Sequence, residues 1–98
     1  REASLTQKVT TPYLYDNYPN PFNPETIISY NLPKASFVIL KVFDVMGKEI
    51  AVLVNDYKEA GRHEIKFSSD EYKLSSGIYF YTLQAGNRFY VRKMVLMR

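Results

Sequence analysis

The chain has 98 residues with 13 lysines and arginines against 10 aspartates and glutamates, so its formal net charge is +3 at pH 7. This length allows one domain with one modest core and excludes a second domain. No run of roughly eighteen apolar residues is present that could span a bilayer as a helix. Cysteine is absent, which excludes disulfide bonds and thiolate metal sites and leaves the redox compartment open.

The first segment, residues 1–12, is polar and has no period of either 2 or 3.6. We interpret it as a linker from an upstream domain and expect residues 13–98 to form the domain itself. Residues 17–24 follow, with three prolines and three asparagines that favour an ordered, extended loop. We expect Tyr18 and Phe22 to anchor this loop by capping one end of the core.

Short β-like runs begin at Thr26 and alternate with turn signals about every ten residues, which is typical of a β-sandwich or barrel. The many tyrosines and phenylalanines also favour strands. Seven strands are predicted, one of them a short strand before the loop: residues 13–15, 26–32, 37–43, 49–54, 62–67, 78–85 and 89–97.

The alternation of apolar residues also predicts which side chains share a face. Residues 28, 30 and 32 form one such set, and residues 38, 40 and 42 form another. The strand 78–85 is apolar on both faces and is therefore expected to be central in its sheet. The last strand is expected to be antiparallel to it and to continue to the end of the sequence. Asp44 to Gly47 reads as a type I turn closed by glycine.

Residues for catalysis or metal binding are few. His63 is the single histidine, and its place on the apolar face of a strand favours a structural role. Oxygen ligands occur between Asp16 and Glu25, but the intervening prolines leave no regular calcium-binding spacing, so turn formation is favoured. The four glycines are widely spaced and form no phosphate-binding loop. We therefore predict no enzymatic activity, no cofactor and no metal.

The charge is unevenly distributed, because Glu71 is the last acidic residue and residues 72–98 carry five basic residues. Such a region could meet a nucleic acid, an anionic membrane or glycolipid, or an acidic receptor groove. Arg88 to Lys93 interleaves basic and aromatic side chains as a stacking platform for bases does. Alternation nevertheless divides the basic residues between two faces, so a half-buried strand with solvated charges is favoured over nucleic-acid binding.

Six motifs in order strengthen a specific interpretation: residues 17–28 (NYPNPFNPETII), 30–33 (YNLP), 42–47 (VFDVMG), 60–63 (AGRH), 74–81 (LSSGIYFY) and 93–96 (KMVL). In this order and spacing they resemble the C-terminal sorting domain, type A, of the type IX secretion system of Bacteroidetes and related bacteria. The resemblance covers residues 13–98.

The resemblance implies a seven-stranded antiparallel immunoglobulin-like β-sandwich that follows a cargo domain in the same chain. It implies passage through the periplasm and the type IX machinery to the outer-membrane cell surface. In many relatives a surface sortase then removes the domain, and the cargo is joined to anionic lipopolysaccharide or released. Translocon recognition maps to Lys93, Met94, Val95, Leu96 and Arg98. The structural residues of the family motifs are Asn20, Pro21, Phe22, Asp44, Gly47, Gly77 and Tyr79.

Two alternatives remain at this stage. The loop and the Gly77–Tyr81 run are also similar to the immunoglobulin-like domain of flagellar hook-capping proteins. The Trp-Asp-Gly stretch typical of that family is replaced here by Phe67-Ser68-Ser69-Asp70. The second alternative is a carbohydrate-binding or spacer module of a secreted hydrolase. Exposed tryptophans would favour this interpretation, and tryptophan is absent.

For the sorting function, the sequence suggests a mechanism. The last strand would add to a strand of a receptor at the sheet edge, with Lys93 and Arg98 supplying charge pairing.

Overall fold

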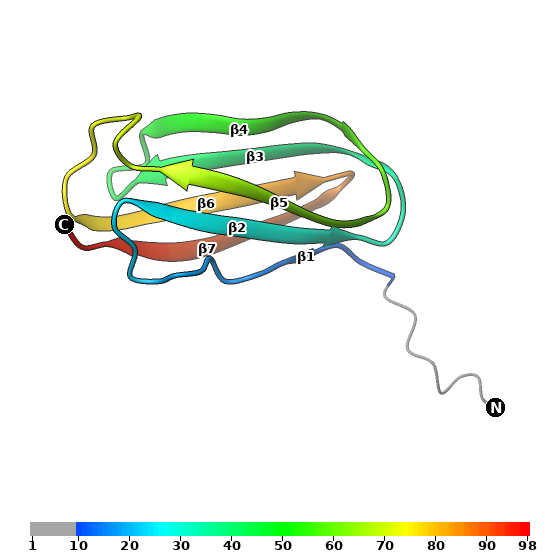
Figure 1. Ribbon diagram of the computed structural model, residues 1–98. Helices are drawn as coiled ribbons and strands as arrows, with labels where there is room; N and C mark the ends of the chain where they lie inside the picture. Colours follow the sequence, from blue (N-terminus) through cyan, green and yellow to red (C-terminus); the bar gives the residue numbers. More distant parts are fainter. Residues whose placement is uncertain (1–9) are drawn as a thin grey trace.

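Residues 10–98 are described by the computed structural model, and they form seven strands and no helix (Figure 1). The strands are β1 (Tyr13–Leu14), β2 (Glu25–Leu32), β3 (Ser36–Asp44), β4 (Glu49–Lys58), β5 (Gly61–Ser68), β6 (Gly77–Ala85) and β7 (Arg88–Leu96). The predicted all-β fold with seven strands is confirmed. Among these residues, nothing forms a helix long and apolar enough to cross a membrane.

The strands form two antiparallel sheets that pack as two layers, as in an immunoglobulin-like sandwich (Figure 1). One sheet has the order β1-β2-β5 and the other has the order β4-β3-β6-β7. Strand β6 lies between β3 and β7, which confirms its predicted central position. Among the strands of residues 10–98, β7 pairs with β6 alone and is therefore at the edge of its sheet.

The core lies between the sheets and contains the residues whose alternation predicted burial. Ile28, Tyr30 and Leu32 of β2 are at most 1% exposed, and Val38, Leu40 and Val42 of β3 are fully buried. Tyr81 and Leu83 of β6 fill the same layer. Both predicted face assignments are therefore confirmed, because one face of each strand meets the opposite sheet and the other does not.

Strand β4 is longer than predicted, continuing from Val54 to Lys58. Asn55 to Lys58 carry polar side chains, but their backbones pair with Ser36 to Ile39 of β3. Exposed polar side chains are common on an edge strand, so the polar sequence after Val54 does not mean that β4 ends there. The last strand ends one residue earlier than predicted, at Leu96.

The loop before β2 anchors the core through one of its two aromatic side chains only. Phe22 is 1% exposed and packs edge-to-face on Phe67, with 6.1 Å between ring centroids. Tyr18 is 79% exposed, so its predicted role as a core cap is wrong. Its backbone exchanges two hydrogen bonds with Ile27, of 2.8 and 3.0 Å, and this bridge leaves its side chain in solvent.

The proposed linker falls mostly on residues 1–9, which lie outside the described residues. Residues 10–12 precede β1 without belonging to a strand.

Candidate recognition site on the last strand

The residues predicted to contact the translocon lie at the end of β7 but do not share one face. Met94 and Leu96 point into the core and are at most 1% exposed. Lys93 is exposed on the opposite face and Val95 is half-buried there. Alternation along a strand imposes this division, so in the folded domain a partner can reach Lys93 and Val95 but not the two buried side chains.

The outer edge of β7 is covered at this end by the loop that precedes β2. Phe22 and Leu96 form a parallel bridge, in which the Phe22 N–H donates to the Val95 carbonyl at 2.9 Å. The Met97 N–H donates back to the Phe22 carbonyl at 3.0 Å. The Asn20 side chain completes the contact, because its Oδ1 accepts from the Val95 N–H at 3.0 Å. We call these contacts of Asn20 and Phe22 the loop clasp.

The Arg98 side chain is turned back onto the domain and joins the loop between β5 and β6. Its Nε donates to the Leu74 carbonyl at 2.7 Å, and its NH2 group lies 2.7 Å from Asp70 Oδ1 and 3.3 Å from Ser69 Oγ. The Arg98 N–H also donates to Ser76 Oγ at 2.8 Å. The planar guanidinium thus fastens Arg98, two residues after the end of β7, to a neighbouring loop.

The other half of β7, from Phe89 to Lys93, has a backbone edge that no other segment of residues 10–98 pairs with. Because Val95 points its N–H and carbonyl away from β6, residues 93, 91 and 89 do so as well in an antiparallel pair. Within residues 10–98 no backbone hydrogen bond reaches the N–H groups of these three residues. Phe89 and Val91 are 62% and 55% exposed, so this half presents both backbone and side chains.

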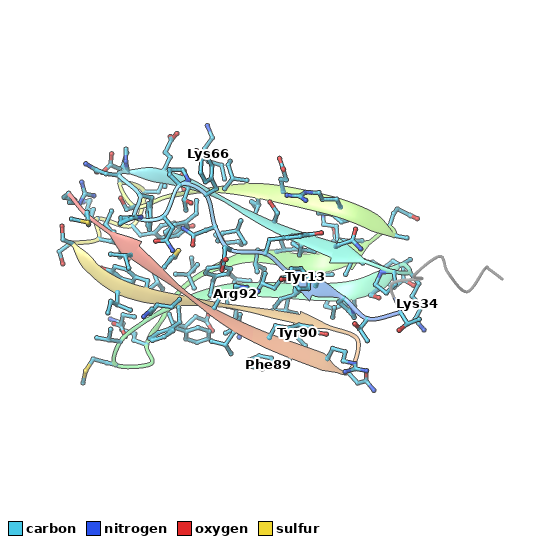
Figure 2. All side chains as sticks on the ribbon, turned by 90° about the horizontal axis from the view of Figure 1, so that it is seen from below. Tyr13, Lys34, Lys66, Phe89, Tyr90 and Arg92 are labelled. Atoms are coloured by element: carbon cyan, nitrogen blue, oxygen red, sulfur yellow. The ribbon has the colours of Figure 1, made fainter. Side chains whose placement is uncertain are left out.

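Arg92 was not singled out as a site residue, yet it joins the two sheets in the middle of β7. Its Nε donates to the Leu14 carbonyl at 2.7 Å, and its NH1 group pairs with Asp16 Oδ1 at 2.9 Å. Figure 2 shows it close to Tyr13, whose hydroxyl lies 3.3 Å from its NH2 group. The signal in the sequence was alternation, which places Arg92 on the same inward face as Met94 and Leu96.

Beneath this position, the Tyr81 hydroxyl donates to the Tyr15 carbonyl at 2.7 Å. Burial disfavours the phenolate and raises the pKa of Tyr81 to about 12, even though the nearby Arg92 cation acts in the opposite direction. Burial also raises the pKa of Tyr30, which lies in the core on β2. These tyrosines act as neutral packing and hydrogen-bonding groups at physiological pH.

Four of the motif residues form turns and strand starts. Asp44 Oδ1 accepts from the Met46 and Lys48 N–H groups at 2.9 Å each, and the Gly47 N–H donates to the Asp44 carbonyl at 3.0 Å. This is the hydrogen bond expected of the predicted turn, and Gly47 has the positive φ of +84° that glycine adopts without strain.

The remaining two of these four motif residues lie at the start of β6. Gly77 opens the strand, and the Tyr79 hydroxyl donates to the Ser75 carbonyl at 2.7 Å.

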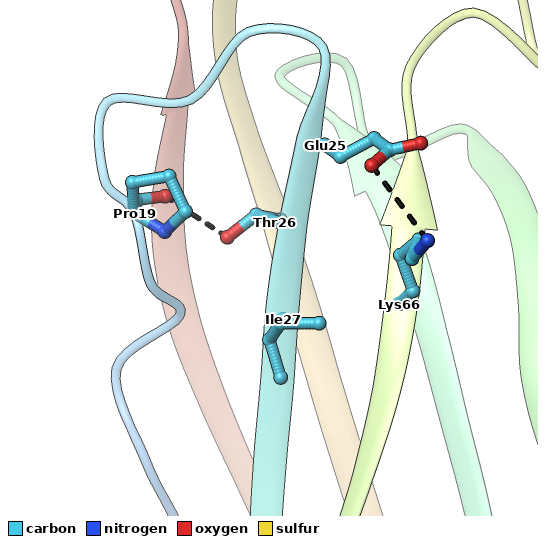
Figure 3. A pocket seen from close by; sticks show the side chains of 5 residues that line it. All are labelled: Pro19, Glu25, Thr26, Ile27 and Lys66. Carbon is cyan, nitrogen blue, oxygen red and sulfur yellow. Dashed lines mark hydrogen bonds and ion pairs between the residues drawn. The ribbon is translucent and has the colours of Figure 1, made fainter.

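Two surface pockets lie away from the predicted recognition residues, Lys93 to Arg98. A pocket of about 190 Å³ is lined by Pro19, Glu25, Thr26, Ile27 and Lys66 (Figure 3). Its polar groups are engaged with one another: Thr26 Oγ1 donates to the Pro19 carbonyl at 2.9 Å, and Lys66 Nζ lies 3.7 Å from Glu25 Oε1.

The second pocket, of about 470 Å³, lies where the chain enters the sandwich and is lined by residues of the segment before β1 and of two turns: Thr10, Pro12, Lys34, Ser36, Ala85, Gly86, Asn87 and Arg88.

His63 packs against Tyr30, with 5.2 Å between ring centroids, and its Nε2 lies 2.8 Å from the Glu59 carbonyl. Ser36 Oγ, at the second pocket, donates to the Lys34 backbone carbonyl at 3.1 Å. In residues 10–98 no group of three histidine or acidic side chains is placed to hold a metal ion. The fold and this site therefore describe an immunoglobulin-like module whose notable surface is an edge strand.

The chain matches the secretion system C-terminal sorting domain family over residues 16–97 and belongs to that family. It is thus a type IX C-terminal sorting signal, which confirms the resemblance recognised from its motifs. The family is not a family of enzymes. The family that matches is neither of the two alternatives considered from the sequence, the hook-capping domain and the carbohydrate-binding module.

No curated protein matches the chain. A solved structure with the same fold is PorZ of Porphyromonas gingivalis, described as an essential bacterial surface component of the type IX secretion system. The TM-score is 0.59 at 18% sequence identity, over 87% of this chain and 11% of the PorZ chain. At this identity the likeness shows the fold alone, and the chain spans about a ninth of the length of PorZ.

Proposed function

We propose that the type IX machinery recognises this sorting domain in its folded state, through the free half of β7 from Phe89 to Lys93. The observation that carries the proposal is the division of β7 into a half covered by the loop clasp and a half with unpaired backbone groups within the described residues. Addition of a receptor strand needs a row of free N–H and carbonyl groups, which only the second half offers. Lys93, at the boundary, would pair with a carboxylate of the receptor.

The remaining residues of the predicted site act indirectly in this proposal. Met94 and Leu96 hold β7 on the core, and Arg98 and the loop clasp hold its end in place. Val95 presents a half-buried side chain beside Lys93. Removal of residues 93–98 would therefore abolish recognition chiefly by loosening β7, because it would remove two core side chains and the clasp together.

The steps after recognition are part of the same proposal. An upstream cargo domain would cross the periplasm and reach the outer-membrane surface together with this domain. A surface sortase would then cut in the segment before β1, and the cargo would be joined to anionic lipopolysaccharide or released. The support for the cleavage position is that β1 begins the sandwich at Tyr13, so a cut before it leaves the core intact.

The direct test is a fluorescent reporter with an inner-membrane signal peptide at its N-terminus and residues 1–98 at its C-terminus, expressed in type IX-competent cells. We expect delivery to the surface, and retention in the periplasm would refute the sorting function of this chain. Substitution Val91→Pro removes an N–H from the free edge, and proline is tolerated on edge strands. We expect it to reduce delivery strongly, whereas Val91→Ala shortens the same side chain but retains the N–H and should be delivered much better than Val91→Pro.

Thermal unfolding of both purified variants separates recognition from folding. The proposal requires that Val91→Pro melts cooperatively near the parent yet is poorly delivered. Equal delivery of the two variants would exclude strand addition at this edge.

A further inference from the structure

The outer face of the four-stranded sheet carries a contiguous apolar surface. Figure 1 shows the other sheet on one side of this sheet only, so its second side faces outward. The exposed fractions are 49% for Phe37, 45% for Val52, 62% for Phe89 and 55% for Val91. Such large exposed apolar side chains are unremarkable singly, but as a group they mark an interaction site. We call Phe37, Ile39, Val52, Phe80, Phe89 and Val91 the apolar face.

Strand register shows that these side chains are neighbours across all four strands. Ile39 is opposite Gln84, which is opposite Phe89. In the next row, Lys41 lies between Val52 on β4 and Thr82 on β6. Residues opposite each other in adjacent strands have side chains on the same face, so the surface extends from β4 to β7.

The outer face of the three-stranded sheet provides an internal comparison, because it meets the same solvent. There Arg62 pairs with Glu64 and Lys66 pairs with Glu25, each at 3.7 Å. On β2, Asn31 is a partly exposed polar residue opposite Arg62, whereas Ser29 opposite Glu64 is buried. Paired charges are typical of a solvated sheet face. The outer face of the four-stranded sheet has one such pair, Lys41 with Glu49, among large exposed apolar side chains.

The charged groups at the apolar face are mainly cationic. Lys41 pairs with Glu49 at 3.0 Å, while Lys93, opposite Phe80, forms no ion pair within residues 10–98. Two copies of this face placed together would therefore bring uncompensated cations close to each other, whereas a partner with carboxylates would neutralise them.

We propose that the apolar face is the docking surface for a folded protein whose complementary surface is apolar with acidic side chains. This rests on the proposed sorting function, since the partner would be a protein met during secretion, and it adds a second contact to the edge of β7. Strands of nine residues in a four-stranded sheet give a flat area of roughly 600 Å². That area is at the small end of specific interfaces, as suits a transient partner.

A lipid surface fits this face less well than a protein does. Gln84 and Asn55 flank Ile39 on both sides, in the middle of the apolar residues. Immersion of amide side chains in acyl chains would leave their hydrogen-bonding groups unsatisfied, at a cost of several kcal/mol. A protein partner can satisfy them with its own polar groups.

The test uses the reporter fusion with two exposed residues distant from the edge of β7. In Phe37→Glu/Val52→Glu, the new carboxylates should repel an acidic partner, and we expect about a tenfold loss of surface delivery, typical of losing one interface anchor. The matched control Ile27→Glu/Asn31→Glu adds the same charge to the outer face of the other sheet and should be delivered like the parent. The variant Phe37→Lys/Val52→Lys should retain more delivery than the glutamate variant. Thermal unfolding verifies that all three variants are folded.

Each outcome decides between distinct ideas. Failure of the parent fusion to reach the surface refutes the sorting function itself. Normal delivery of both the parent and Phe37→Glu/Val52→Glu leaves that function intact and overturns the docking surface alone. A dimer of the purified chain in sedimentation, lost in the glutamate variant, would overturn the inference in favour of a second copy. Pelleting of the chain with vesicles containing anionic phosphatidylglycerol, also lost in that variant, would overturn it in favour of a membrane.

Discussion

The two halves of β7 have similar sequences and different surroundings. Both halves, the second taken with the two residues that follow β7, mix apolar and basic residues. Met94 to Arg98 are held by the core, the loop clasp and the loop between β5 and β6, whereas the outer edge of Phe89 to Lys93 is unpaired within residues 10–98. Composition therefore does not distinguish a recognition surface from a structural anchor within one strand. Contacts with residues distant in the sequence distinguish the two. Substitutions in the two halves should therefore differ in their effects on stability.

The largest difference is expected between Leu96→Ala and Phe89→Ala. Leu96 is 1% exposed, so its truncation should lower the free energy of unfolding by about 2–5 kcal/mol. Phe89 is 62% exposed, and its truncation should change stability by less than about 0.5 kcal/mol. Chemical denaturation of both variants measures the contrast. Similar losses for the two variants would contradict the division of β7.

The junction between the halves should be sensitive to alkaline pH. Burial raises the pKa of Tyr81 to about 12 from about 10 in the unfolded chain, so the proton is held more tightly in the folded state. The resulting stability is complete below about pH 10 and is lost as the pH rises through about 12, on the order of 2 kcal/mol. Denaturant titrations at several pH values should show this decline, and Tyr81→Phe should show a smaller one. Parallel declines would exclude Tyr81 as the titrating group.

The loop clasp should contribute less than the core. Asn20→Ala removes the acceptor of the Val95 N–H, which is worth about 1 kcal/mol. Asn55→Ala on the exposed edge of β4 is the matched control and should have little effect. Hydrogen exchange gives a residue-specific measure: the Val95 amide should exchange faster in Asn20→Ala, and an unchanged rate would show that the clasp does not protect this edge.

The smallest effect is expected at Arg98. Its pair with Asp70 is partly exposed, so Arg98→Ala should cost at most about 1 kcal/mol and less at high salt. Arg98→Lys keeps the charge but loses the planar fork that reaches both Leu74 and Asp70. Thermal unfolding of both variants at two salt concentrations separates the two contributions. Full stability of Arg98→Lys would indicate that charge alone suffices.

Much of the fold could be predicted from the sequence, because period-two alternation directly reflects a strand with one buried face. It identified all seven strands and the inward residues of β2 and β3, such as Tyr30 and Leu40. Alternation failed to predict how far a strand extends where backbone pairing does not depend on the side chains. Asn55 to Lys58 are polar but belong to β4, since their backbones complete the ladder with β3.

The site was less predictable, because its character depends on contacts between segments far apart in the chain. Alternation separates Lys93 from Met94 and Leu96, but it cannot show that Asn20 covers the edge from 75 positions away. The same holds for Arg92 and its bond to the Leu14 carbonyl, 78 positions away. Tyr18 and Phe22 are both aromatic in one loop, and only the bridge to Ile27 leaves Tyr18 outside the core.

The loop clasp has a consequence for the behaviour of this domain when many copies are crowded together. Met94 to Met97 is an apolar segment of the kind that recruits identical chains into aggregates when its backbone is open. Phe22 turns its N–H and carbonyl toward β7, so the adjacent Pro21 faces outward, and proline has no N–H to offer to another strand. The proline-rich loop thus stops the sheet from growing along this apolar segment.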